Sequence, residues 1–484
     1  VTCMLFLFTG LVCLHLFLDT NFGSTVASFA TFVIIFGTNA MDQLVDQQLM
    51  THNYSFALYA ILLWATQRLH QRINVQRSLL VGLILGLLII VRPTNGLALL
   101  IPLLWPLEGH SFIGKWRTLF KQHKLELFIL VASMSAVSFI LLGYWKIYAG
   151  SWFYDSYQNP AEGLDIFYSH LHKFLFSFRK GWFVYTPIML IAVFGLFRLW
   201  RTRWKATFVI TAFLVIFIFI VSSWTLWYYP GGFGQRAAVD IYPLMAVGLA
   251  SVLQWLQGVS GVRRFLVASA IVLLVALNLF QTVQQRRGVQ EPNRMTASYY
   301  FRAFFDFQPD EAKKSLLLFD RPTKADVQLD GLNEYEVHGE WQQPVPISPD
   351  QLAPDGKPAF LLDAEHPFTP AFELEYRALT PGDHAWVEIS GRIYSDTLIS
   401  ETDASIVASM DHHGNYGYKA VDLKGFPNMT PGQWNEFSFN YLTSVARRPW
   451  DPLRVYGWFR NGQTIWLDGL RVKSFVPKPS DGSP

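Results

Sequence analysis

The chain has 484 residues, of which 51% are hydrophobic and 16% aromatic, and this composition argues against a single soluble domain and for a membrane-bound part. The formal net charge is only +3, and no basic tract suggests a nucleic acid as a partner. The only two cysteines, Cys3 and Cys13, lie in the first apolar run, which excludes a disulfide framework in the rest of the chain.

The amino terminus lacks the features of a targeting segment. The chain begins with Val1 inside an apolar run, and no Lys or Arg occurs before Arg68. A secretory signal or an ordinary first anchor carries basic residues beside its apolar core. We therefore expect that further sequence of this protein precedes Val1.

Residues 1–282 alternate apolar runs with short polar loops, which predicts a polytopic α-helical membrane domain of about ten apolar segments. The runs fall at about 1–18, 25–40, 51–67, 79–91, 95–107, 126–148, 183–199, 206–223, 237–256 and 265–282. The two runs around Arg92-Pro93-Thr94-Asn95 are too short for two ordinary spans. We expect a broken helix or a re-entrant hairpin there, because freed backbone is tolerated where it lines a polar cavity.

Basic residues predict the orientation. They gather in four loops, at 68–77, 115–124, 198–205 and 263–264, which the positive-inside rule assigns to the cytoplasm. The loops 41–52, 149–182 and 224–236 then face the other side, together with the carboxy-terminal domain.

Several charged residues stand out in these outer loops. Arg179 and Lys180 lie there against the usual charge bias, so they are candidates for binding an anionic headgroup. Arg236 follows a glycine-rich turn at 231–234, which fits neither a dinucleotide fingerprint nor a P-loop. Its glycines leave room for backbone to approach a phosphate, so we expect Arg236 to act in binding.

Aromatic residues of the same loops have two explanations. Trp182, Trp224, Trp227 and Tyr228 form a stacking wall for a sugar or an isoprenoid in the functional interpretation. In the simpler one, each belongs to the interfacial belt of any membrane protein. His52 likewise fits an interfacial histidine with satisfied hydrogen bonds better than a catalytic one.

No Cys and His set has metal-ligand spacing, and we expect neither a metal nor another cofactor, although a divalent metal stays an open alternative. His412 and His413 lie on an expected hairpin turn. We predict that they are solvated rather than bound to zinc.

Four blocks carry a resemblance: MTHNYSF (50–56), VRPTNG (91–96), SFRKGWFVYTPIM (177–189) and WYYPGGFGQRAAVDIYPL (227–244). In this order and spacing they resemble the bacterial family-39-like glycosyltransferases of the GT-C superfamily, which are akin to protein mannosyltransferases. The resemblance covers residues 41–282. It implies a multi-pass enzyme of the bacterial inner membrane that moves a sugar, with inversion, from a polyprenyl-phosphate carrier to a protein, lipid or glycan acceptor outside the cytoplasm.

Members of that superfamily usually carry a catalytic Asp or Asp/Glu pair in the first outer loop. This sequence departs from the pattern, because Asp19 is the only acidic residue among its first 40 residues. We therefore expect the catalytic loop upstream of Val1 and leave the catalytic residue unknown. Asp42 and Asp46 are the nearby outer carboxylates that could replace it, and His52 is a third candidate.

The substrate-binding residues fall in the matching blocks. We expect Asp240 to orient Arg236, because Asp240 lies four positions further on at the start of a helix, although a plain helix-end carboxylate is the alternative. The full predicted set is Arg92, Asn95, Arg179, Lys180, Trp182, Trp227, Tyr228, Gly232, Gln235, Arg236 and Asp240.

The segment 283–330 is predicted to be an interfacial helix and linker, 331–478 an outer β-sandwich and 479–484 a disordered tail. Alternating segments at 384–395, 404–411, 418–423, 435–442, 453–460 and 464–475 predict the antiparallel strands. The ending WFRNGQTIWLDGLRVKSF (458–475) looks like the last strands of jelly-roll modules that bind carbohydrate. Trp386, Trp434, Trp450 and Trp458 either stack on sugar or fill the core.

Two other functions are compatible with this sequence. A non-enzymatic carrier or flippase component for lipid-linked glycans would need a broken helix and outer cations but no general base. A third possibility is that the chain is an inactive fragment in which only the sandwich functions, by binding glycan.

Overall fold

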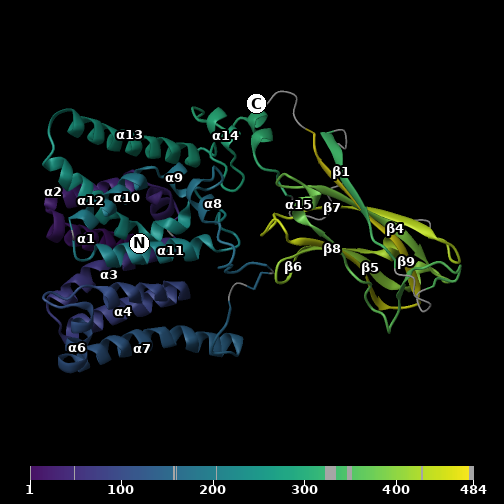
Figure 1. Ribbon diagram of the computed structural model, residues 1–484, viewed down its shortest axis with the longest axis horizontal. Helices are drawn as coiled ribbons and strands as arrows, with labels where there is room; N and C mark the ends of the chain where they lie inside the picture. Colours follow the sequence, from purple (N-terminus) through teal and green to yellow (C-terminus); the bar gives the residue numbers. More distant parts are fainter. Residues whose placement is uncertain are drawn as a thin grey trace. The chain divides into compact units, whose positions relative to one another are not determined.

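The computed structural model describes residues 2–47, 49–155, 158–159, 161–202, 204–321, 334–345, 352–426 and 429–478. The chain divides into two compact units, one of Val1–Tyr157 with Leu164–Leu317 and one of Gln158–Gly163 with Leu318–Pro484 (Figure 1). The first is helical and the second is mostly β-structure. The predicted tail at 479–484 and the linker residues 322–330 lie outside the described residues.

The helical unit contains fourteen labelled α-helices among its described residues. They are α1 (Thr2–Phe22), α2 (Ser24–Phe36), α3 (Thr51–Gln71), α4 (Val75–Val91), α5 (Leu100–Leu104), α6 (Phe112–Gln122), α7 (Lys124–Ala149), α8 (Leu171–Phe176), α9 (Trp182–Tyr185), α10 (Ile188–Arg201), α11 (Thr207–Ser222), α12 (Tyr242–Gln257), α13 (Gly261–Arg286) and α14 (Ala297–Arg302).

Four helical segments of the described chain are long and apolar enough to cross a membrane: Thr2–Phe22, Lys124–Ala149, Arg236–Gln257 and Gly261–Arg286. This confirms a helical unit with segments able to span a membrane, whereas the number of about ten apolar segments stays a prediction. The other apolar helices are shorter, such as Ser24–Phe36, Val75–Val91, Pro93–Leu104 and Thr207–Ser222.

The helices differ in how deeply they are packed. The most apolar window of Arg236–Gln257 is 89% buried, whereas that of α7 is only 6% buried. Helix α12 therefore forms the centre of the unit and α7 an outer layer beside α4 (Figure 1).

Small residues permit the closest helix contacts. A Cβ added at Gly82 of α4 would lie 2.0 Å from Ser133 Oγ of α7, and one at Gly195 of α10 would lie 1.9 Å from Gly248 O of α12. Such contacts are typical of membrane helices, where association depends on close packing rather than on the hydrophobic effect.

The predicted break near residue 92 is present. Helix α4 ends at Val91, Arg92 is extended with φ −154°, and Pro93–Leu99 continues as a 3-10 helix into α5. Proline disfavours the helical conformation in the residue before it, which explains the extended Arg92.

The helical unit continues to Leu317, beyond the predicted boundary at residue 282. The reason is an apolar cluster in which Tyr299 and Tyr300 of α14 pack with Tyr185 and Phe233. Residues of the predicted linker are thus part of the helical unit.

The second unit is an antiparallel β-sandwich, as predicted. Its strands are β1 (Tyr335–Gln342), β2 (Phe360–Leu362), β3 (Phe372–Glu375), β4 (Trp386–Tyr394), β5 (Asp403–Asp411), β6 (Asn415–Asp422), β7 (Asn435–Leu442), β8 (Pro452–Asn461) and β9 (Ile465–Pro477), with the short helix α15 (Tyr376–Leu379). One sheet has the order β1-β9-β4-β7, with β2 also on β9, and the other has β3-β8-β5-β6. Alternate residues of both sheets, such as Ile389, Ile406 and Val455, fill the core between them.

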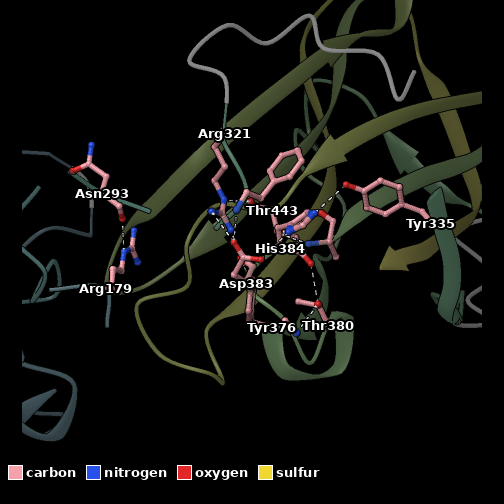
Figure 2. A network of polar contacts seen from close by, with 12 residues as sticks. Arg179, Asn293, Arg321, Tyr335, Tyr376, Thr380, Asp383, His384 and Thr443 are labelled. Atoms are coloured by element: carbon pink, nitrogen blue, oxygen red, sulfur yellow. Dashed lines mark hydrogen bonds and ion pairs between the residues drawn. The ribbon is translucent and has the colours of Figure 1, made fainter. Parts of the chain in front are cut away.

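A polar network fastens the start of this unit to the sandwich (Figure 2). The Arg321 guanidinium donates to the backbone oxygens of Asp383 and of Thr443, the latter at 3.0 Å from Nε. The backbone N–H of Phe319 donates to Asp383 Oδ2 at 3.0 Å, and the Phe319 ring stacks on His384. Residues 319–321 therefore belong to the sandwich fold.

Candidate functional site

Three polar residues from distant segments meet in the helical unit. His52 Nδ1 donates to Asp240 Oδ1 at 2.7 Å, and Arg92 Nη1 donates to Asp240 Oδ2 at 3.3 Å. Arg92 Nη2 lies 3.3 Å from His52 Nε2, which accepts because a guanidinium has no acceptor atom. The side chains of His52 and Asp240 are each 1% exposed, whereas that of Arg92 is 25% exposed. The cluster thus reaches solvent through its cation.

Local structure explains how these side chains converge. His52 lies in the first turn of α3, Arg92 at the break after α4, and Asp240 in the 3-10 turn Arg236–Ile241 before α12. Helices α3 and α4 are antiparallel neighbours, so the start of one lies beside the end of the other. The helix break therefore places Arg92, with its extended backbone, where its side chain reaches Asp240.

The role expected for Asp240 was to orient Arg236. The partners that the structure gives Asp240 are instead His52 and Arg92. Positions 236 and 240 lie in a 3-10 turn, where residues three apart are aligned and the α-helical four-residue pairing is lost.

The glycine-rich turn has a left-handed backbone. Gly231, Gly232 and Gly234 have φ of +87°, +67° and +61°, values that favour glycine. A Cβ at Gly232 would also lie 2.2 Å from Gln43 Nε2 and 3.2 Å from Asp42 Oδ2. This turn therefore packs against the short π-helix Met41–Asp46 that follows α2.

Lys180 also holds this glycine-rich turn. Its ammonium group donates to the backbone oxygens of Gly231, at 3.2 Å, and of Gly232. Burial lowers the pKa of Lys180 to about 7, and the charges of Asp42, Arg236, Glu291 and Arg179 act on it with smaller, partly cancelling effects. Lys180 is thus close enough to Arg179 and Arg236 for their charges to act on its pKa.

Arg179 lies over the ring of Tyr228, with 3.5 Å between the guanidinium carbon and the ring centroid. Figure 2 shows its guanidinium directed at Asn293, where Nε donates to the backbone oxygen at 2.8 Å. The Asn293 side chain in turn accepts from Gly231 N at 2.8 Å. Asn293 was not singled out from the sequence, because it lies in a segment interpreted as a linker.

Asp42 and Asp46, the carboxylates considered as replacements for the catalytic residue, differ in their partners. Asp46 forms a two-bond ion pair with Arg286 of α13, at 2.8 Å and 3.0 Å. Asp42 is buried and accepts from Phe233 N at 2.9 Å and from Gln47 and Gln43. Burial raises the pKa of Asp42, and these hydrogen bonds oppose the shift. Asp42 thus supports the glycine-rich turn.

Other predicted residues support the framework. Asn95 accepts from Tyr59 Oη at 3.2 Å and donates to Ser55 and to Leu88 O, which fixes the break after α4. Gln235 is fully buried and donates to Trp227 O at 3.1 Å.

The predicted aromatic wall is largely enclosed. Trp182 is 1% exposed and stacks on Phe183 and Tyr242, while Trp227 and Tyr228 are buried and meet edge to face. In this conformation Trp182 packs within the core.

Comparison with protein-family models, with curated proteins and with solved structures gives no match to this chain. The functional argument therefore depends on the residues themselves. Within the described ranges, no group of three or more His, Cys, Asp or Glu side chains could hold a metal ion.

The expectation that both histidines of the β5–β6 turn are solvated is wrong for His412. It is buried, and its Nδ1 donates to Asp451 Oδ1 at 3.0 Å. Asp451 also accepts from Tyr416 Oη at 3.2 Å and from the backbone N–H groups of Arg447 and Arg448. No local pattern predicts this pairing, because 39 positions separate His412 from Asp451.

Proposed function

We propose that this chain is part of a membrane glycosyltransferase that moves a sugar from a polyprenyl-phosphate carrier to an acceptor outside the cytoplasm. The observation that carries the proposal is the Arg92 guanidinium, held by a buried carboxylate and a histidine and partly open to solvent. A guanidinium with free N–H donors binds phosphate oxygens well. Arg236, just after the glycine-rich turn of the same helical unit, adds a second guanidinium.

In the proposed reaction an acceptor hydroxyl oxygen attacks the anomeric carbon. The bond between that carbon and the phosphate oxygen breaks, and polyprenyl phosphate leaves with the electron pair. Cations stabilise the charge that develops on the leaving oxygen. Inversion at the anomeric carbon follows from a single displacement, in agreement with the resemblance described above.

The hydroxyl proton needs an acceptor, and His52 is the candidate that the geometry favours. Its Nδ1–H is held by Asp240, which orients the ring and leaves Nε2 as the basic atom. Nε2 now accepts a hydrogen bond from Arg92. A phosphate that draws Arg92 toward itself would free Nε2 for the proton.

We propose that the sandwich binds glycan. We also propose that its fold is a jelly roll. Phe368 and Trp458 stack with ring planes 13° apart, and the Arg460 guanidinium lies 4.7 Å from the Trp458 ring centroid. Phe368 is exposed. An aromatic face beside charged side chains suits the apolar face and the hydroxyls of a hexose.

The test is sugar transfer in proteoliposomes that contain the full-length protein and a radiolabelled polyprenyl-phosphate sugar. Replacing Arg92 with Gln should lower transfer by about 100-fold or more, since a lost phosphate contact in a shielded site costs on the order of 3 kcal/mol. Arg264→Gln, at the exposed start of α13, is the matched control and should keep wild-type transfer. Equal transfer by the Arg92→Gln and wild-type proteins would exclude the proposed role.

A second candidate is a non-enzymatic carrier of lipid-linked glycans. Burial of both His52 and Asp240 favours it, because a carrier needs no exposed base. The same proteoliposomes separate the two: a carrier moves the labelled lipid between leaflets without forming a glycosylated acceptor.

A further inference from the structure

Helix α6 has the pattern of a helix that lies along a membrane surface. Its aromatic residues Phe112, Trp116 and Phe120 recur every four positions and contact one another in series. Phe120 is 60% exposed although it is apolar. Arg117 and Lys121 follow the aromatic residues along the helix and are exposed too. An exposed apolar stripe beside a basic one is typical of interfacial helices.

The helix is firmly anchored through Lys115. This buried side chain donates to the backbone oxygens of Pro102, Leu103 and Trp105 at 3.1, 2.9 and 2.6 Å. These oxygens belong to the end of α5 and the residue after it, where helix carbonyls lack intrahelical partners. The position of α6 is therefore fixed by the protein.

An open apolar groove of about 230 Å³ lies beneath α6. Its lining comes from α3, α4, α5, α6, α7 and the turns beside them, and includes Leu69, Leu103, Trp116, Leu119, Leu130 and Met134. Very little of the lining is polar, with His70, Ser78, His123 and Glu126 as the polar members. Such a surface suits a hydrocarbon chain and disfavours a sugar or a nucleotide.

The depth of the groove matches one leaflet of a bilayer. Its lining runs along α7 from His123, just before the helix, to Met134, which is about 16 Å at 1.5 Å per residue. Half of a bilayer's hydrocarbon core is about 15 Å thick. Since α7 is long and apolar enough to span a membrane and is hardly buried, a membrane-embedded α7 would expose the groove to lipid.

Basic residues adjoin the groove lining along the chain, because Arg117 follows Trp116 and both Lys121 and Lys124 lie within two positions of His123. The exposed residues Arg117, Lys121 and Lys124 lie on α6 and at the start of α7, and the acidic residue nearby, Glu126, lies 3.5 Å from His123. Clustered basic residues at a membrane interface attract anionic headgroups. A phospholipid would place its phosphate beside these residues when one of its chains fills the groove.

We infer that the groove under α6 binds a phospholipid with an anionic headgroup. One acyl chain lies between α6 and α7, and the headgroup contacts Arg117, Lys121 and Lys124. The site is separate from the proposed transfer site, because Leu69 is near the end of α3 and His52 is in its first turn. Helix α3 has 21 residues and is therefore about 30 Å long.

The inference can be tested with the whole chain in phosphatidylcholine vesicles. Trace spin-labelled phosphatidylglycerol or phosphatidylcholine is added, and the fraction of motionally restricted label gives the relative association constant of each lipid. We expect phosphatidylglycerol to associate at least about fivefold more strongly, the effect of roughly one well-placed basic residue. The double variant Arg117→Gln/Lys121→Gln should reduce this preference to about onefold or twofold.

The matched control is Arg263→Gln/Arg264→Gln, which removes the same charge from exposed positions at the start of α13. It should keep the full preference. Met134→Trp, which fills the groove, should lower the amount of restricted lipid while the basic residues stay in place.

Three outcomes would overturn the inference. Wild-type protein could hold both lipids equally, or the control could lose as much preference as the α6 variant. Third, glycerol phosphate, which has no acyl chains, could displace the labelled phosphatidylglycerol, and the groove would then play no part in binding. If Met134→Trp fails to fold, Leu127→Trp in the same groove answers the same question.

Discussion

Asp240 and His52 lie 2.7 Å apart, although 188 positions separate them in the chain. The same carboxylate receives Arg92 on its other oxygen. One buried negative charge thus joins the start of α3, the break after α4 and the turn before α12. This arrangement leaves a cation at the accessible edge of a buried polar cluster.

Replacing Asp240 with Asn should destabilise the protein. The variant keeps the shape of the side chain but leaves Arg92 and His52 beside a neutral group, and breaking a buried ion pair costs on the order of 3 kcal/mol. Thermal unfolding in detergent measures the change. The control is Asp46→Asn, which removes the more exposed pair with Arg286 and should cost at most about 1 kcal/mol. Equal losses in the two variants would contradict the structural role of Asp240.

Adjacent glycines give a second prediction. An alanine at Gly232 would be strained by the left-handed backbone, and its Cβ would lie only 2.2 Å from Gln43 Nε2. An alanine Cβ at Gly231 would have the same backbone strain, but its nearest neighbouring atom would be 3.7 Å away. We expect Gly231→Ala to cost about 1 kcal/mol and Gly232→Ala at least about 2 kcal/mol, measured as the shift of thermal unfolding. The result would speak against the packing of this turn on Asp42 and Gln43 if both variants behaved alike.

The pKa of about 7 for Lys180 predicts a pH dependence. The ordinary pKa of 10.5 applies to the unfolded chain, so between pH 7 and 10.5 only the unfolded chain carries this charge. Stability should rise with pH in that window by up to about 1.4 kcal/mol per unit, and below pH 7 the cost of burying the charge is fully present. The measurement is the difference in unfolding free energy between wild type and Lys180→Met at several pH values. A constant difference from pH 7 to 10 would refute the shift.

The sandwich offers a fourth prediction. Asp451 accepts hydrogen bonds from His412, Tyr416 and the backbone of Arg447 and Arg448, so Asp451→Asn leaves several buried donors poorly paired. We expect a loss of about 2–4 kcal/mol in the unfolding step of the sandwich. Asp396→Asn serves as a control, because that exposed carboxylate accepts from Tyr394 at the surface. A similar, small effect of both variants would show that the Asp451 network contributes little.

The strands of the sandwich could be predicted well because alternation of apolar and polar residues follows directly from strand geometry. The segments expected at 404–411 and 435–442 correspond to β5 at Asp403–Asp411 and β7 at Asn435–Leu442. The break at Arg92 was also predictable, since proline acts on its immediate neighbour. The contacts between side chains of distant segments were not predictable. Asp240 was assigned to Arg236 because a sequence shows only the spacing of nearby residues.

By itself, the sequence determined what depends on neighbouring residues: apolar helical segments, the helix break and the β-strands. The tertiary structure alone decided which of these groups meet. It placed Asp240 against His52 and Arg92, Lys180 against the carbonyls of the glycine-rich turn, and Asn293 beside Arg179. Hydrogen bonds and ion pairs act over about 3 Å, and that distance between remote segments is fixed only by how the helices pack.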